Sequence, residues 1–335
     1  MRATILLLLV GSGAAGCVRS YADAPALPYA EVPYVGPDGA AWPEEHLTLD
    51  GVAAHYRMKS TPTITYVELN PEGAKTLIFV HGLGSYLKFW QPQLNHFAAL
   101  GYRVVALDMV GYGKSDKPGS FPYTMEAMAD VVLALRQHLG GPAPVLVGHS
   151  MGGQTALSYA IRYPDHLSAL VLTSPAGFET FSAREKAWFR KVFATTLVTL
   201  ADEHAIWGAI RENNFDRWRD DLEWLIEERV RTAKNDDFEA YAYANVRSVH
   251  GLLENDFVRQ SLEHVTVPTL IVHGDADRLI PNRFLHAGAT VDVMSVGADR
   301  IPDATLITLP GCGHTVQLDC PADYNAAVEA FLKAR

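Results

Sequence analysis

The stretch GHSMGG at residues 148–153 surrounds a single serine, Ser150, with glycines. The apolar run PVLV at 144–147 precedes it, and residues 154–162 follow with the composition of a helix. A strand, a Gly-x-Ser-x-Gly turn and a helix in this order are typical of a strained elbow that exposes the serine hydroxyl. The stretch therefore predicts a nucleophilic serine between a strand and a helix of an α/β fold.

Short apolar runs recur along the chain and are mostly separated by segments of helical length. They lie at 77–80, 104–107, 145–147, 169–172, 269–272 and 305–309. Such alternation predicts a doubly wound, mostly parallel sheet. A hairpin with strands at 47–49 and 52–56 and an Asp-Gly turn between them is expected to add an antiparallel edge.

One interval between predicted strands is too long for a single connection. It contains the sequence SARE at 182–185, which matches a helix capping box. Apolar residues then repeat at helical spacing between 218 and 226. We therefore predict a helical cap at 178–265, inserted into an α/β core formed by residues 44–177 and 266–335.

The amino terminus has the pattern of an export signal. A positive charge at Arg2 is followed by an apolar run at 3–10 and by small residues up to Cys17. The apolar run is too short to span a bilayer. We therefore assign residues 1–17 to a signal peptide, and the prolines of residues 18–43 predict an extended, semi-stiff tether.

The end of this signal, AAGC at residues 14–17, resembles the lipobox of bacterial lipoproteins. The resemblance implies that Cys17 carries the lipid and holds the protein at a bacterial membrane. Because Val18 is not aspartate, the resemblance favours the outer membrane. Release into the periplasm or the medium is the alternative expectation.

Composition and motifs exclude several other classes of function. The chain has 335 residues and a net charge of −10, with no basic cluster, so we expect no nucleic-acid partner. The sequence GKS at 113–115 lacks the first glycine of a phosphate-binding loop, because position 108 is Asp. No zinc-binding His-Glu-x-x-His run occurs, so neither a metal nor a cofactor is expected.

A serine hydroxyl needs a general base, usually histidine, to become a nucleophile. Of the thirteen histidines, His314 follows the last predicted strand in a glycine-rich loop and is the best candidate. Structural roles are expected for His149 beside the serine, for His81 after a strand, and for His273 at a strand end. The base in turn needs a carboxylate to orient it.

The carboxylate candidates are Asp275 and Asp277, which both follow the predicted strand at 269–272. Their position at the end of that strand suits either of them to orient the histidine.

Several stretches besides the elbow resemble the α/β-hydrolase fold family. HGLG at 81–84 resembles the oxyanion loop of that family. DMVGYGKS at 108–115 resembles the Asp-x-x-Gly-x-Gly-x-Ser turn of the same proteins. GDADRLIP at 274–281 resembles the acid loop, and GCGH at 311–314 resembles the histidine loop. The resemblance extends over about residues 45–335 and is weakest in the predicted cap.

The resemblance assigns a role to several residues. It selects Asp277 as the triad acid, and it implies that the backbone N–H groups of Leu83 and Met151 form the oxyanion hole. His81 and Gly82 are expected to support the oxyanion loop. Together with the serine and His314, these residues imply a serine hydrolase.

The expected reaction is hydrolysis of small apolar carboxylic esters through an acyl-enzyme. Two alternatives remain. The first is a hydrolase of carbon–carbon bonds in diketone-type substrates, and the second is a ligand-binding member of the fold without turnover. The sequence does not indicate the oligomeric state.

The remaining cysteines, Cys312 and Cys320, lie on either side of His314. Exported proteins can form disulfides, and a bond here would close a short loop around the expected base. Two separately packed thiols are the alternative.

Overall fold

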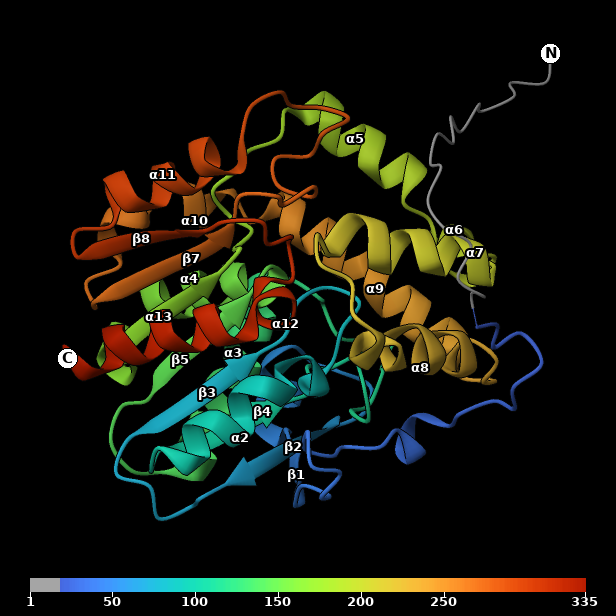
Figure 1. Cartoon of the computed structure of the whole chain (residues 1–335), viewed down its shortest axis with the longest axis horizontal. Helices are drawn as coiled ribbons and strands as arrows, with labels where there is room; N and C mark the ends of the chain where they lie inside the picture. Colours follow the sequence, from blue (N-terminus) through green and yellow to red (C-terminus); the bar gives the residue numbers. More distant parts are fainter. Residues whose placement is uncertain (1–18) are drawn as a thin grey trace.

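The computed structural model describes residues 19–335. The predicted export signal and Cys17 lie outside the described residues. Within this part of the chain the strands form one sheet with eight strands, in the order β1-β2-β4-β3-β5-β6-β7-β8 (Figure 1). The strands β1 and β2 pair in an antiparallel manner, β2 is also antiparallel to β4, and the remaining neighbours are parallel. This is the mostly parallel sheet that the sequence predicts.

The strands are β1 (Glu44–Thr48), β2 (Thr63–Leu69), β3 (Thr76–Val80), β4 (Arg103–Leu107), β5 (Val145–His149), β6 (Ala169–Thr173), β7 (Thr269–Gly274) and β8 (Ala304–Leu309). The helices around the sheet are α1 (Asp50–His55), α2 (Gln91–Ala99), α3 (Met125–Leu139), α4 (Met151–Arg162), α11 (Thr290–Arg300), α12 (Val316–Asp319) and α13 (Pro321–Lys333). Those between β6 and β7 are α5 (Ala183–Val192), α6 (Thr195–Thr199), α7 (Glu203–Trp207), α8 (Trp224–Thr232), α9 (Phe238–Glu254) and α10 (Asp256–Gln260).

Helices cover both faces of the sheet, because successive strand residues point to opposite sides. In β3, Leu77 and Phe79 join the core under α2 and α13. Ile78 and Val80 join the second core, which α3 and α4 cover (Figure 1). Burial on both faces explains why the central strands are continuous apolar runs rather than alternating ones.

The predicted hairpin at the edge of the sheet is wrong in its second strand. Residues Asp50–His55 form helix α1, and β1 pairs with β2 instead. The helix buries Val52 and Ala53 and exposes the residues on either side of them. Over only six residues, the apolar pattern of such a short helix cannot be told apart from that of a strand. The antiparallel edge is present, but its partner strand lies at 63–69.

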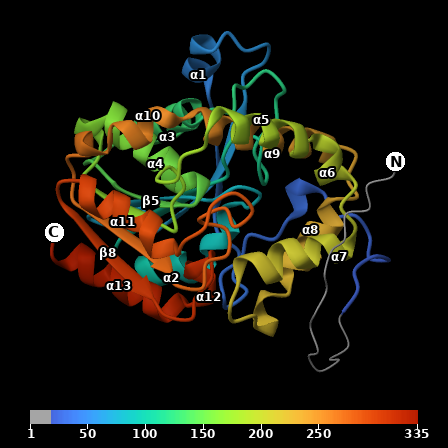
Figure 2. The same cartoon turned by 90° about the horizontal axis from the view of Figure 1, so that it is seen from above.

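The segment between β6 and β7 is helical and projects on the side of the molecule away from the carboxyl terminus (Figure 2). Its first helix begins with the predicted capping box, because Ser182 and Glu185 satisfy each other's backbone N–H groups. No helix in residues 19–335 is long and apolar enough to cross a bilayer.

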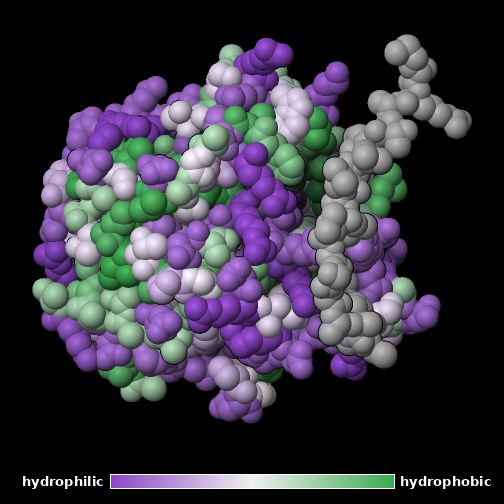
Figure 3. All heavy atoms as spheres, turned by 45° about the horizontal axis from the view of Figure 1, so that its top comes forward, coloured by the Kyte–Doolittle hydropathy of each residue, from purple (hydrophilic) through white to green (hydrophobic). Residues whose placement is uncertain are grey.

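Apolar side chains remain on the outer surface of this segment. Trp188 and Val192 of α5 are about half exposed, as is Leu197 of α6, and Leu200 is 81% exposed. Figure 3 shows apolar areas among the polar ones on the side where these helices lie. Trp188 and Val192 are four residues apart, and Leu197 and Leu200 are three apart, so each pair lies on one side of its helix. The helices α5 and α6 thus each expose an apolar edge to solvent.

The described part of the predicted tether, residues 19–43, is not a free spacer. Leu27, Val32, Tyr34 and Trp42 join the core on the α2 side of the sheet, and Tyr29 joins the opposite core. Burial of these apolar side chains holds the segment against the protein. They are spaced irregularly between prolines, so the sequence shows no periodic pattern that would predict the packing.

Candidate active site

Ser150 lies where β5 ends and α4 begins. It has a φ angle of +52°, a left-handed conformation that costs a residue with a side chain on the order of 1–3 kcal/mol. The residue is partly exposed although its neighbours on both sides are buried. The turn thus presents the hydroxyl at the surface of the site, as the sequence predicts for an elbow.

The glycines of the elbow are required by close contacts. A Cβ atom on Gly148 would lie 2.3 Å from the carbonyl oxygen of Gly152. A Cβ atom on Gly152 would lie 2.3 Å from the carbonyl oxygen of Val80 in β3. The strand and the helix can therefore cross at this distance only when both positions lack a side chain.

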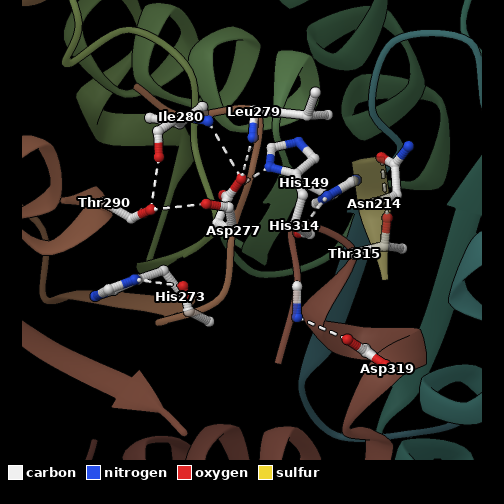
Figure 4. Close-up of polar contacts among 12 residues, drawn as sticks. His149, Asn214, His273, Asp277, Leu279, Ile280, Thr290, His314, Thr315 and Asp319 are labelled. Carbon is white, nitrogen blue, oxygen red and sulfur yellow. Dashed lines mark hydrogen bonds and ion pairs between the residues drawn. The ribbon is translucent and has the colours of Figure 1, made fainter. Parts of the chain in front are cut away.

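His314 and Asp277 form a hydrogen-bonded pair beside the elbow. His314 Nδ1 donates to Asp277 Oδ2 at 2.8 Å, and both side chains are almost fully buried (Figure 4). The other oxygen of Asp277 accepts the N–H groups of Leu279 and Ile280 at 2.8 and 3.2 Å. Because Nδ1 carries the proton, Nε2 of His314 is the nitrogen left to accept one.

Asp275, the other candidate, has a different partner. Its Oδ1 accepts the N–H of Gly311 at 2.7 Å, and the residue is exposed. The two aspartates thus hold the histidine loop at two points. Asp277 contacts the imidazole, and Asp275 fixes the backbone at the start of the loop.

His149 connects Ser150 to His314. Its ring lies 5.0 Å from the ring of His314, and its Nε2 donates to the carbonyl oxygen of His314 at 3.2 Å. Within residues 19–335 no hydrogen bond joins the hydroxyl of Ser150 to His314. Catalytic hydrogen bonds often tighten only when substrate is bound. The observation that brings the elbow and the histidine loop together is the contact of His149, the residue before Ser150, with His314.

His81 is buried and fixes the loop after β3. It accepts the N–H of Met109 at Nε2 over 3.1 Å, so the proton is on Nδ1, which donates to the carbonyl of Gly82 at 2.8 Å. A Cβ atom on Gly82 would lie 2.7 Å from the ring of His149 and 3.2 Å from Cβ of Ser150. This loop therefore lies against the elbow only because position 82 is glycine.

The backbone N–H groups of Leu83 and Met151 are available to a ligand. Neither donates a hydrogen bond within the described residues. Met151 is the first residue of α4, where N–H groups have no partner in their own helix. Two such groups beside a serine are suited to binding a developing oxyanion.

Asp108 has a structural role, as expected from its position before the serine. It is fully buried, and it accepts the N–H groups of Leu87 and Lys114 and the hydroxyl of Tyr34. Burial raises its pKa to about 6. His273 is also structural, since its two nitrogens bond to Gly274 and Thr308.

Asp319, which no motif in the sequence indicates, holds the backbone of the histidine loop. This buried carboxylate, labelled in Figure 4, accepts the N–H of Gly313 at 2.6 Å. It also accepts the N–H groups of Asp216 and Arg217 at 2.7 and 2.9 Å. It thus ties the loop to the segment between β6 and β7. An acidic residue one position before a cysteine gave no signal of this contact in the sequence.

Cys312 and Cys320 are joined by a disulfide bond. The bond closes the loop that carries His314, and both cysteines are buried. Of the two expectations for these residues, the bonded one is present in the structure.

Burial of His81 predicts a loss of stability in acid. Desolvation lowers its pKa to about 4, whereas an unfolded histidine titrates near 6.5. Between these values the unfolded chain binds a proton that the folded protein excludes. Lowering the pH from 7 to 5 should therefore reduce the free energy of unfolding by about 2 kcal/mol through this residue.

Urea unfolding of the wild type and of His81→Gln at pH 7 and pH 5 measures this effect. The raised pKa of Asp108 acts in the opposite direction between about pH 4 and 6, but it contributes equally to both proteins. The wild type should lose about 2 kcal/mol more than the variant. Equal losses in the two proteins would contradict the assignment of a neutral, buried His81.

A mostly parallel sheet with a serine elbow after one central strand, and an Asp–His pair in the loops after two later strands, is the architecture of α/β hydrolases. The sequence model of the family described as alpha/beta hydrolase fold matches residues 75–321. The chain belongs to this family.

Known proteins of several kinds are similar to it. An uncharacterized hydrolase of Bacillus subtilis, YugF, is 28% identical over 88% of this chain and 99% of its own length. The 2-hydroxymuconate semialdehyde hydrolase of Pseudomonas sp. CF600 is 30% identical over 76% of this chain and 86% of its own length. The structure of a probable hydrolytic enzyme from Pseudomonas aeruginosa PAO1 superposes with a TM-score of 0.79 at 24% identity, covering 93% of this chain and 99% of the other. The two relatives found by sequence support a hydrolase, and the solved structure supports the fold.

Proposed function

We propose that the protein is a serine hydrolase that cleaves carboxylic esters through an acyl-enzyme. The observation that carries the proposal is the buried bond between His314 Nδ1 and Asp277 Oδ2, next to a serine with a φ angle of +52°. The bond fixes the tautomer that leaves Nε2 free to accept a proton.

In the first half of the reaction, Ser150 Oγ attacks the ester carbonyl while its proton passes to Nε2 of His314. The negative charge that develops on the carbonyl oxygen is stabilised by the N–H groups of Leu83 and Met151. Nε2 then returns the proton to the leaving alcohol as the C–O bond breaks. Asp277 stabilises the imidazolium between the two proton transfers.

In the second half, a water molecule attacks the acyl-enzyme. It gives one proton to Nε2, and its oxygen bonds to the acyl carbon. Collapse of the tetrahedral intermediate returns that proton to Ser150 Oγ and releases the acid. No step requires a metal ion or a cofactor, so the residues named above account for the whole cycle.

Hydrolysis of p-nitrophenyl esters tests the proposal directly. Purified protein should release p-nitrophenol with a burst or steady turnover that a fluorophosphonate abolishes. A properly folded protein that turns over no ester and resists the fluorophosphonate would instead support a ligand-binding member of the fold.

A second candidate is hydrolysis of carbon–carbon bonds in diketone-type substrates, which can use the same three residues. The 30% identity to a 2-hydroxymuconate semialdehyde hydrolase favours this candidate. Turnover of ring-cleavage products at a higher kcat/KM than that of any p-nitrophenyl ester would select it.

We also propose that the protein is exported and anchored to a membrane through a lipid on Cys17. The lipobox-like end of residues 1–17 is the main support. The Cys312–Cys320 disulfide adds to it, because such bonds persist in oxidising compartments. The exposed apolar edges of α5 and α6 suit a protein held near lipid.

Metabolic labelling with an alkyne-tagged fatty acid tests the anchor. Cells making the wild-type chain should incorporate the label into the protein, and cells making Cys17→Ser should not, because the acyl chains need the cysteine. The wild-type protein should also stay in the membrane fraction after a high-salt wash, whereas Cys17→Ser should be washed off. Equal labelling of both proteins, or of neither, would refute lipidation at Cys17.

A further inference from the structure

The described part of the chain begins already attached to two helices. Tyr21 is 4% exposed and packs with Ile206 of α7 and Ile226 of α8. Its carbonyl oxygen accepts the ammonium of Lys234, two residues after α8, at 2.9 Å. The amino-terminal segment is therefore fixed to α7 and α8 from residue 21 onward.

The residue before Tyr21 is held at the same place. Glu203, the first residue of α7, accepts the hydroxyl of Ser20 and the N–H of Tyr21, both at 2.8 Å. Cys17 is three residues before Ser20. Three residues of chain span at most about 11 Å, so a lipid on Cys17 would be tied closely to the start of α7. It would not be at the end of a long tether.

The helix before α7 exposes apolar side chains at this end of the molecule. Leu200 is three residues before Glu203, so their Cα atoms are also at most about 11 Å apart. With an exposed fraction of 81%, Leu200 is the most exposed large apolar side chain of residues 19–335. Leu197, on the same side of α6, is 52% exposed. Figures 1 and 2 both show α6 beside α7.

The sequence around the two leucines suits a lipid surface. The stretch VFATTLVTLA at 192–201 contains no charged residue, and Trp188 and Val192 continue the exposed apolar surface onto α5. Two exposed cations, Arg184 and Lys191, also lie on α5. Cations near an apolar surface are typical of segments that lie in the membrane interface, because they attract the phosphates of the headgroups.

The short connection to Cys17 also decides between possible partners of this surface. A second copy of the chain or another protein could cover exposed leucines as well as lipid can. Only the bilayer, however, would be brought to α6 and α7 by the chain itself. The acyl chains would enter the membrane at Cys17, and a few residues later the backbone is bound to α7.

We propose that α6 lies on the bilayer, with Leu197 and Leu200 inserted into the interface of the membrane that holds Cys17. The inference rests on the proposed lipid at this cysteine. Apolar surfaces of interfacial helices enter the membrane to a depth of about 5–10 Å, which the short connection allows. The lipid and the two leucines together give the protein one orientation on the membrane.

Quenching of tryptophan fluorescence by brominated lipid tests the contact. The full-length chain, with the lipid on Cys17 verified by intact mass, is reconstituted into vesicles of phosphatidylethanolamine and phosphatidylglycerol with brominated acyl chains. Leu200→Trp places a reporter on α6. The wild type contains six tryptophans and supplies the background that is subtracted.

The matched control is Leu100→Trp, directly after α2. Leu100 is also exposed, at 45%, and α2 and α6 lie apart in both views (Figures 1 and 2). The brominated lipid should reduce the added emission at position 200 by about half or more, and that at position 100 by less than about a tenth. Because both side chains are exposed, the thermal unfolding of the two variants should match that of the wild type.

The outcomes separate the contact from the anchor. Absence of quenching at position 200, or equal quenching at positions 200 and 100, in protein that carries the lipid would overturn the inference and leave the anchor in place. An intact mass without lipid on Cys17 would refute the anchor and the inference with it. A dimer of the Cys17→Ser chain that Leu200→Ser dissociates, with position 200 unquenched, would show that a second copy covers α6 instead.

Discussion

Replacement of Ser150 by alanine should abolish ester hydrolysis while leaving the fold intact. The expected loss in kcat is on the order of a million-fold, because no other group can form the acyl-enzyme. Alanine removes only the hydroxyl, which makes no hydrogen bond within residues 19–335. Its thermal unfolding should therefore match that of the wild type.

A matched control is Ser158→Ala on the same helix, α4. Ser158 is fully buried, and its hydroxyl also lacks a hydrogen-bond partner in the described chain. The control should retain nearly full turnover. Near-normal activity of purified Ser150→Ala would remove the basis of the mechanism.

The second large effect is expected at Asp277. Asp277→Asn should lower kcat by about ten-thousand-fold, because an amide in this position favours the wrong tautomer of His314. Its Oδ1 can still accept from Leu279 and Ile280, so the loop geometry should persist.

Asp275→Asn is the matched variant for this experiment. Within residues 19–335 the Asp275 carboxylate accepts a hydrogen bond from the backbone N–H of Gly311, and an amide oxygen can replace that contact. The kcat of this variant should fall less than about tenfold, because the imidazole of His314 keeps its hydrogen bond to Asp277. If Asp275→Asn were the more damaging change, the roles of the two aspartates would have to be exchanged.

The parallel core of the fold could be predicted because each of its strands is an apolar run with helices on both sides. The order of the strands could not, since β4 lies between β2 and β3 through contacts that no local pattern encodes. The second strand predicted for the antiparallel edge, at 52–56, was wrong for the same reason. A six-residue amphipathic segment such as Asp50–His55 becomes a helix or a strand according to the surface that it meets.

The positions of candidate site residues could be predicted where a single loop has a recognisable sequence pattern and also carries the residue. The elbow of Ser150 and the glycine-rich loop of His314 are of this kind. The contact of Asp319 with Asp216 and that of Tyr34 with Asp108 were not predictable, because they join residues 103 and 74 positions apart in the chain. Tyr34 reaches Asp108, and Asp319 reaches the N–H of Asp216, without any periodic spacing to indicate it.

The central claim is that Ser150 forms a covalent intermediate with His314 as its base, and one measurement tests it most directly. The protein is treated with a fluorophosphonate, digested, and examined by mass spectrometry to locate the adduct. The account predicts a single modified residue, Ser150, with labelling strongly slowed in His314→Ala, because the hydroxyl then lacks its base. A modified residue other than Ser150, or labelling of Ser150 at an unchanged rate in His314→Ala, would contradict the account.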